Sequence, residues 1–204
     1  MLNKNFISTL GLTLDDLQIN NLQSYAELVL NKNQEFNLTA AKTLQEVFNR
    51  HISDGLQAAS ILRQEGFVTK TGADFGSGAG FIGITAAIAL PNTKIYLVDS
   101  LQKRTKFLQW IVYKIGLKNV EILNLKIGQI SLQRKFDFIL ERAMGEIDDV
   151  LPLCLNSLTD NGAFFALLSK DTQSEINASK EYFYSLPGDK TVSGRKISVY
   201  YGHN

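Results

Sequence analysis

The hydrophobic pattern of the first third of the chain is helical. Residues 13–33 carry leucine, tyrosine, alanine and valine at roughly helical spacing, and Thr13 and Asp16 stand in the positions of a capping box. Residues 43–62 show a second amphipathic helical pattern. We therefore expect residues 1–70 to form an N-terminal helical cap.

The pattern changes after Gly72, where short apolar runs alternate with helical segments. Five runs rich in β-branched or aromatic residues predict strands over residues 72–75, 94–99, 120–125, 136–141 and 163–168. Helices are predicted over residues 80–90, 103–115, 145–158 (closed by a turn at 160–162) and 172–183. This alternation favours an α/β fold with a doubly wound, mostly parallel sheet.

The last two predicted strands break the alternation. Residues 184–186 and 196–201 are joined by the turn-rich residues 187–194, with no helix between them. They should form a C-terminal antiparallel hairpin and complete a seven-stranded sheet. A hairpin in this place is typical of class I, Rossmann-like methyltransferases, so we assign residues 71–204 to a methyltransferase domain.

Composition narrows the chemistry. A chain of 204 residues suits one domain, with or without a small appendage. The single cysteine, Cys154, excludes an internal disulfide, and two histidines without clustered carboxylates give no reason to expect a metal site. The N-terminus lacks the apolar stretch of a signal peptide, and the longest apolar run, residues 81–90, is too short to cross a bilayer. We expect a cytoplasmic protein without a membrane partner.

Charge is unevenly distributed although the net charge is only +1. A basic stretch with Glu121 as its lone acid contains Lys103, Arg104, Lys106, Lys114, Lys118, Lys126, Arg134 and Lys135. Such a stretch is the footprint expected for a polyanionic partner. A solvated helix face explains the charges alone equally well.

The most informative segment is GADFGSGAGFIGI, residues 72–84. A predicted strand carrying Asp74 runs into Gly76, Gly78 and Gly80 and then opens a helix. Glycine lets the backbone turn sharply and approach a ligand closely, and a helix N-terminus presents free N–H groups. The segment therefore predicts a ligand-binding loop.

Glycine spacing alone leaves the ligand open. Gly78, Gly80 and Gly83 also fit the dinucleotide fingerprint, so NAD or FAD is an alternative. The next strand ends in Asp99, at the distance where an acid reaches ribose hydroxyls in such folds. Asp74 favours a ligand with an ammonium group, because a carboxylate beside the loop would repel a pyrophosphate. We therefore predict S-adenosylmethionine as the cofactor.

Seven segments in order along the chain resemble the GidB/RsmG family of bacterial methyltransferases. They are FNLTA (36–40), RHISDG (50–55), DFGSGAGFIGI (74–84), VDSLQKRTKFL (98–108), GLKNVEI (116–122), FDFILERA (136–143) and GRKISVYY (194–201). The first two are the specific ones, because generic methyltransferases lack them. The resemblance implies methylation of N7 of a guanosine in small-subunit (16S) ribosomal RNA.

The resemblance also implies cofactor contacts, with Asp99 holding the ribose, Ile127 and Gly128 beside the adenine and Arg142 facing both cofactor and substrate. The implied set is Asp74, Gly76, Gly78, Gly80, Phe81, Asp99, Ile127, Gly128 and Arg142. The chain departs from the family pattern in four places: residues 81–85 lack the usual prolines, Gly128 replaces an acid, Met144 replaces a phenylalanine, and Leu168-Ser169 replaces a Lys-Gly pair, with Lys170 two residues later. These departures leave open altered specificity, or a degenerate member that binds without reacting.

The residues expected at the RNA come from the cap, the helix after Asp99 and two later segments. They are Asn37, Thr39, Arg50, His51, Lys103, Arg104, Arg142 and Lys170. Without the resemblance, Asn37 and Thr39 would simply cap a helix, and His51 would be a core or surface residue. Lys103 and Arg104 open a helix, where cations oppose the dipole, so we prefer phosphate contact to a local stabilising role.

The chemistry implied needs no catalytic acid–base pair. Guanine N7 has an in-plane lone pair and no proton at neutral pH, so alignment and desolvation can carry the reaction without a general base. The expected partner is small-subunit ribosomal RNA, free or in a ribosomal particle, and we expect a monomer. The alternatives are a methyltransferase for a small molecule or protein, and a dinucleotide-binding protein without methyl transfer.

Overall fold

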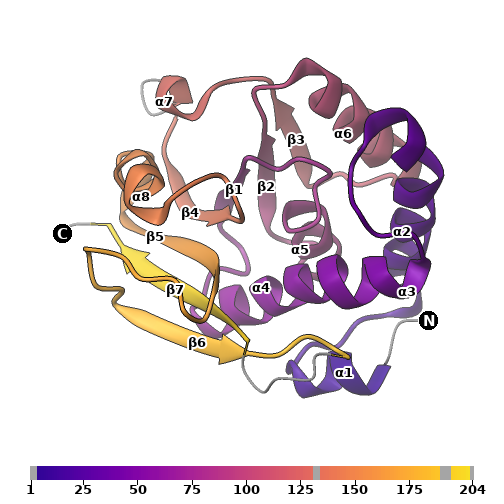
Figure 1. The fold of residues 1–204 in the computed structure, drawn as a ribbon, viewed down its shortest axis with the longest axis horizontal. Helices are drawn as coiled ribbons and strands as arrows, with labels where there is room; N and C mark the ends of the chain where they lie inside the picture. Colours follow the sequence, from indigo (N-terminus) through magenta and orange to yellow (C-terminus); the bar gives the residue numbers. More distant parts are fainter. Residues whose placement is uncertain (1–3, 131–133, 189–193, 203–204) are drawn as a thin grey trace.

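The computed structural model describes residues 4–130, 134–188 and 194–202, and these build one seven-stranded sheet (Figure 1). Its order is β3-β2-β1-β4-β5-β7-β6, and only β7 runs antiparallel to its neighbours. The strands are β1 (Thr71–Phe75), β2 (Lys94–Val98), β3 (Val120–Leu123), β4 (Phe136–Glu141), β5 (Leu158–Ser169), β6 (Lys180–Tyr184) and β7 (Arg195–Tyr201). The predicted parallel sheet with a C-terminal hairpin is confirmed.

Helices cover both faces of the sheet. They are α1 (Lys4–Thr9), α2 (Asp16–Phe36), α3 (Leu44–Val47), the π-helix η1 (Phe48–Ile52), α4 (Ser53–Gln64), α5 (Gly83–Ala89), α6 (Gln102–Ile115), α7 (Ile127–Ile130) and α8 (Ile147–Leu155). Alternate residues of each strand face opposite layers. On β2, Ile95 and Leu97 join the core under α4, α5 and α6, whereas Tyr96 and Val98 join the core under α8.

The N-terminal helices share the larger of these two cores. Leu22 and Val29 of α2 are buried in the same hydrophobic cluster as Ile84 of α5 and Phe107 of α6. Tyr25 is also buried there, and its hydroxyl donates to the carbonyl of Ala79 at 2.9 Å. The helices before residue 70 therefore hold the loop after β1 in place. No helix among the described residues is long and apolar enough to cross a membrane.

The helix predicted over residues 43–62 exists as three contiguous stretches, α3, η1 and α4. Thr43 caps its start by accepting the Glu46 N–H, at 3.2 Å. The π-helical stretch in the middle contains Arg50 and His51. Single π-turns inside α-helices are frequent at functional sites.

The helix predicted over residues 172–183 is wrong. Residues 180–184 form β6, which pairs with β7 at the edge of the sheet. The residues before β6 are not helical. The carboxylate of Asp148 holds them by accepting hydrogen bonds from the Ser174 hydroxyl and the Glu175 N–H. The strand expected at 184–186 accordingly lies earlier. Pairing with a distant strand has overridden the local pattern.

Two local expectations also need correction. The capping box of α2 is formed by Asp15 and Gln18 rather than Thr13 and Asp16. The turn expected at residues 160–162 lies inside β5, where the register against β4 shifts and a β-bulge absorbs the turn-prone residues. The short helices α1 and α7 were not predicted, since neither is long enough to show a period.

Gly72 gives a test of the packing at the centre of the sheet. A Cβ at this position would lie 2.2 Å from the ring of Phe138 on the neighbouring β4. We expect Gly72→Ala to lower the free energy of unfolding by about 1–3 kcal/mol in urea titrations, because the ring cannot shift within a close-packed core. Gly128→Ala is the control, since its Cβ would have nothing within 4 Å. Equal losses in the two variants contradict the clash.

Candidate functional site

The loop between β1 and α5 is built as the glycine pattern predicts. Gly76 and Gly80 have left-handed φ angles of +64° and +85°, which other residues adopt only with strain. A Cβ at Gly76 would also lie 2.3 Å from Cγ of Met144. The backbone at Gly76 therefore lies directly against Met144 in the loop after β4, and only glycine fits there.

Asp74 ends this strand as a buried carboxylate, 2% exposed. Its Oδ2 accepts the N–H of Gly83, at 3.0 Å, at the start of α5. Burial raises the pKa of Asp74 to about 7. A carboxylate in this state favours a positively charged group beside it, since a cation lowers the cost of its ionisation.

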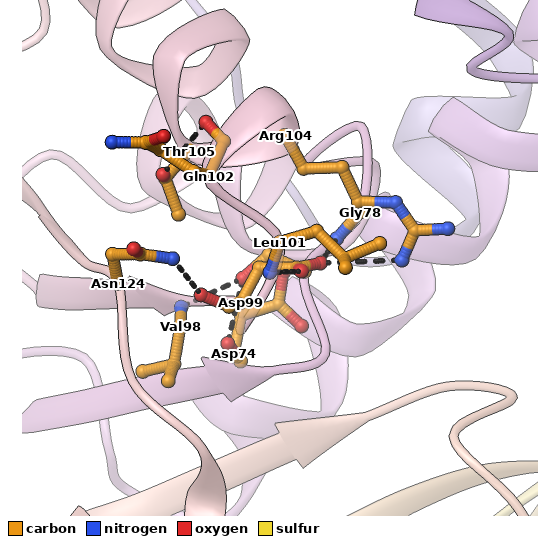
Figure 2. Close-up of polar contacts among 10 residues, drawn as sticks. Asp74, Gly78, Val98, Asp99, Leu101, Gln102, Arg104, Thr105 and Asn124 are labelled. Carbon is orange, nitrogen blue, oxygen red and sulfur yellow. Dashed lines mark hydrogen bonds and ion pairs between the residues drawn. The ribbon is translucent and has the colours of Figure 1, made fainter.

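Asp99 ties the glycine loop to α6 (Figure 2). Its Oδ2 accepts the Gly78 N–H at 3.0 Å and lies 3.4 Å from Nη1 of Arg104, and its Oδ1 accepts the Leu101 N–H at 2.9 Å. Asn124 donates to the backbone carbonyl of Asp99, at 3.0 Å. The predicted pairing of glycine loop and downstream acid is therefore present, and Arg104 points to the acid.

Two cavities meet over this loop and form one groove, which we call the Gly76 groove. The first, about 270 Å³, is lined by Asp74 and by the loop residues 76–82 except Gly80, and the second, about 370 Å³, by Asp99 and Ile127. They share the lining residues Gly76, Arg104 and Ala143. Each cavity of the groove thus has one aspartate in its lining, and Val98, Leu125, Ile127 and Met144 add apolar walls to the second cavity.

These features fit S-adenosylmethionine. Asp74 suits the cationic methionine part, the carboxylate of Asp99 suits hydroxyl donors of a ribose, and the apolar walls suit a flat ring. Gly80 and Gly128 do not line the Gly76 groove. Gly80 instead packs its backbone against Ile84 and Leu108.

A buried ion-pair cluster stands beside the groove. Asp54 of α4 accepts from Nη1 of Arg142 at 2.8 Å, from Nη1 of Arg195 at 2.7 Å and from the hydroxyl of Tyr184 at 2.9 Å. Burial raises the pKa of Tyr184, and the adjacent Asp54 adds to the effect. The two guanidinium groups are therefore fixed by one carboxylate.

His51 connects this cluster to the loop at residues 37–40. Arg142 donates to Nδ1 of His51 at 3.4 Å, so the ring proton lies on Nε2, which donates to Oγ1 of Thr39 at 2.7 Å. The imidazole stacks on Phe81 with ring centroids 4.0 Å apart. Burial lowers the pKa of His51 to about 4, with Arg142 the next cause. His51 is therefore neutral at physiological pH.

A third cavity, about 570 Å³, opens next to the groove, and we call it the Arg142 cavity. It shares Arg142, Ala143 and His51 with the first cavity of the groove. Its other polar lining residues are Arg50, Glu141, Glu146, Ser169, Thr172 and Arg195. Ala143 has a φ of +63°, so strained backbone lies at the junction.

Sequence reasoning missed three residues of this arrangement, Glu141, Arg195 and Asp54. Glu141 ends β4 and accepts the Met144 N–H at 2.6 Å, and burial raises its pKa. All three lie inside segments that resemble the family, but the local sequence assigns them no role of their own. A charged residue within an apolar strand, as in FDFILERA, was the available signal.

The remaining predicted residues separate into different places. Asn37 and Thr39 line the Gly76 groove and Arg50 lines the Arg142 cavity. Lys103 donates to the carbonyl of Glu35 at 2.7 Å, so it caps the C-terminal end of α2. The expectation that Lys103 has no local stabilising role is therefore wrong. Lys170 lines neither space.

Comparison with known proteins agrees with this geometry. A model of the family described as rRNA small subunit methyltransferase G (GidB) matches residues 18–193. Two relatives carry the name ribosomal RNA small subunit methyltransferase G. That of Leuconostoc citreum is 34% identical over 190 residues, covering 90% of this chain and 80% of the relative. That of Salmonella arizonae is 32% identical over 202 residues, covering 98% and 92%.

A likeness among solved structures supports the fold alone. The structure of TrmN from Thermus thermophilus is 17% identical, covers 76% of this chain and 53% of that chain, and has a TM-score of 0.55. With the sheet order, it confirms the predicted fold class. The family model and the relatives confirm the resemblance. The chain belongs to the rRNA small subunit methyltransferase G (GidB) family.

Proposed function

We propose that this protein transfers a methyl group from S-adenosylmethionine to N7 of a guanosine in small-subunit ribosomal RNA. The observation that carries the proposal is the junction of the Gly76 groove with the Arg142 cavity at Arg142 and Ala143. One space suits the methyl donor and the adjoining one an acceptor. The names of the relatives support a ribosomal RNA substrate.

The donor, when bound, supplies a methyl group on a positively charged sulfur. Asp74 would hold the ammonium end of its methionine part, and Asp99 would accept from the ribose hydroxyls. Ile127 and Val98 would contact the adenine. Phe81 and His51, stacked on each other, would close the groove where it meets the Arg142 cavity.

The target guanine would lie in the Arg142 cavity. Its O6 accepts hydrogen bonds, and Arg142 and Arg195 are donors fixed at the wall of this cavity. Methyl transfer places positive charge on the purine, and Glu141 and Glu146 supply negative charge in the same cavity. No proton has to be removed from N7, which agrees with a neutral His51 held by Thr39 and Arg142.

The outer face of α6 supports an RNA partner. Lys106, Gln109 and Lys114 are exposed, as is the ring of Tyr113, which is 82% exposed. Exposed lysines with an aromatic ring between them suit an RNA backbone with unstacked bases. Lys103 and Arg104 of the same helix are engaged with Glu35 and Asp99, so the exposed lysines are the stronger candidates for phosphate contact.

The direct test is methyl transfer in vitro. Small-subunit particles and free RNA from a strain lacking this protein would be incubated with it and labelled S-adenosylmethionine, and the RNA analysed by mass spectrometry. We expect 7-methylguanosine at one position in at least one of these two substrates. A methyl group on another atom, or none in either substrate, contradicts the proposal.

Removal of the Asp99 carboxylate should weaken cofactor binding. We expect Asp99→Ala to raise the calorimetric Kd for S-adenosylmethionine at least about tenfold, because the ribose loses a charged acceptor. Glu121→Gln is the matched control, since it removes one exposed negative charge from β3. Equal affinity in Asp99→Ala and the wild type contradicts the ribose role.

Cofactor affinity should also depend on pH through Asp74. Its pKa is raised to about 7 by burial, and a cationic ligand binds the ionised form. Affinity should therefore fall as pH drops below 7, approaching about tenfold per pH unit down to about pH 5.5. Asp74→Asn should bind weakly with a flat profile over this range. A flat wild-type profile means that Asp74 does not face the cationic group.

The lysines of α6 give a test on the RNA side. We expect Lys106→Ala combined with Lys114→Ala to weaken RNA binding and to reduce the salt slope of the affinity by up to about 2. Lys70→Ala with Lys94→Ala is the control, because it removes the same charge at the N-terminal ends of the parallel strands β1 and β2, the ends away from the glycine loop. An identical salt slope in both double variants excludes this face from the interface.

A further inference from the structure

A fourth cavity, about 460 Å³, lies beside the Arg142 cavity, and we call it the Phe183 cavity. Its walls are the segment between β5 and β6 and the sheet edge formed by β5, β7 and β6. Figure 1 shows this segment passing in front of β7. The Phe183 cavity shares Leu168 and Thr172 with the Arg142 cavity, so the two spaces adjoin at the C-terminal end of β5.

The lining of the Phe183 cavity combines an aromatic surface with amides, hydroxyls and cations. Phe183 is 56% exposed although it is a large apolar side chain. The polar lining side chains are Lys170, Thr172, Gln173, Ser174, Asn177, Ser179, Glu181 and Lys196. Lys180 also lines the cavity, but its ammonium group binds Glu65, the residue directly after α4.

The acid in this cavity is already neutralised. Glu181 accepts from Nζ of Lys196 at 2.8 Å and from the Ser198 hydroxyl at 3.0 Å. Lys170 is exposed and leaves the cavity with net positive charge. An aromatic platform, neutral hydrogen-bonding groups and a cation together match a nucleotide, which has a base, polar base edges and a phosphate.

The segment between β5 and β6 that lines this cavity is held in place by α8. Asp148 of α8 binds the Ser174 hydroxyl at 2.5 Å and the Glu175 N–H at 3.1 Å, and Ala178 packs against the core under α8. The Phe183 ring stays open to solvent beside this segment.

We propose that the Phe183 cavity binds the RNA nucleotide next to the methylated guanosine. Its base stacks on Phe183, its edge bonds Gln173 or Asn177, and the phosphate that joins it to the target contacts Lys170. The inference deepens the proposed function and rests on it, because the neighbouring cavity must hold the target base. It also gives the enzyme a means to read a base that it does not modify.

The test compares variants in methyl transfer to unmodified small-subunit RNA or particles. We expect Phe183→Ala to raise the KM for RNA about tenfold, the effect of losing one stacked base, with kcat and cofactor Kd unchanged. Phe183→Trp should restore the KM, and Lys170→Ala should raise it by several-fold. Leu17→Ala, which removes an exposed apolar side chain from α2 (67% exposed), is the control and should change nothing.

An RNA with a single abasic site separates base stacking from a general surface effect. An abasic site on one side of the target should weaken the wild type as much as Phe183→Ala does, and should not weaken Phe183→Ala further. Wild-type KM values for RNA in both Phe183→Ala and Lys170→Ala overturn the inference. If the wild type itself transfers no methyl group to RNA, the proposed function fails instead, so the two failures are distinct.

Discussion

The buried carboxylate of Asp54 is the interaction on which this site depends. It is 0% exposed on α4 and receives hydrogen bonds from Arg142, Arg195 and Tyr184. A carboxylate buried without such partners would be strongly destabilising. Its donors lie in β6, in β7 and directly after β4, so this one group joins α4 to this part of the sheet and sets the position of both arginines.

One carboxylate facing two guanidinium groups leaves an excess positive charge at the wall of the Arg142 cavity. The excess suits guanine O6 or phosphate, whereas Glu141 and Glu146 in the same cavity suit the charge that methylation creates. Through His51, the cluster reaches Thr39 and Phe81 in the Gly76 groove. The Gly76 groove and the Arg142 cavity therefore share one polar network.

The parts of this molecule that local rules govern were predictable from sequence. Gly76 and Gly80 need left-handed backbone, and Asp99 follows its strand at a spacing that brings it to the loop. Asp54, Arg142 and Arg195 lie far apart in the chain, and nothing in their neighbours indicates that they converge. The helical pattern at residues 172–183 gave a wrong prediction for a similar reason. Pairing with the distant strand β7, which the local pattern does not reveal, makes residues 180–184 a strand. The role of Lys103 depends on the end of a distant helix.

Three residues that depart from the family pattern, Met144, Leu168 and Lys170, line the cavities of the site. Met144 lies against Gly76 and lines the Gly76 groove, so a flexible side chain stands there where the family favours a phenylalanine. Its backbone N–H donates to the Glu141 carboxylate. Leu168 lines both the Arg142 and Phe183 cavities, where the family favours a lysine. Lys170, two residues later, lines the Phe183 cavity but not the Arg142 cavity. If the two cavities hold the target base and its neighbour as proposed, this cation would lie away from the developing positive charge and near the phosphate between the two nucleotides.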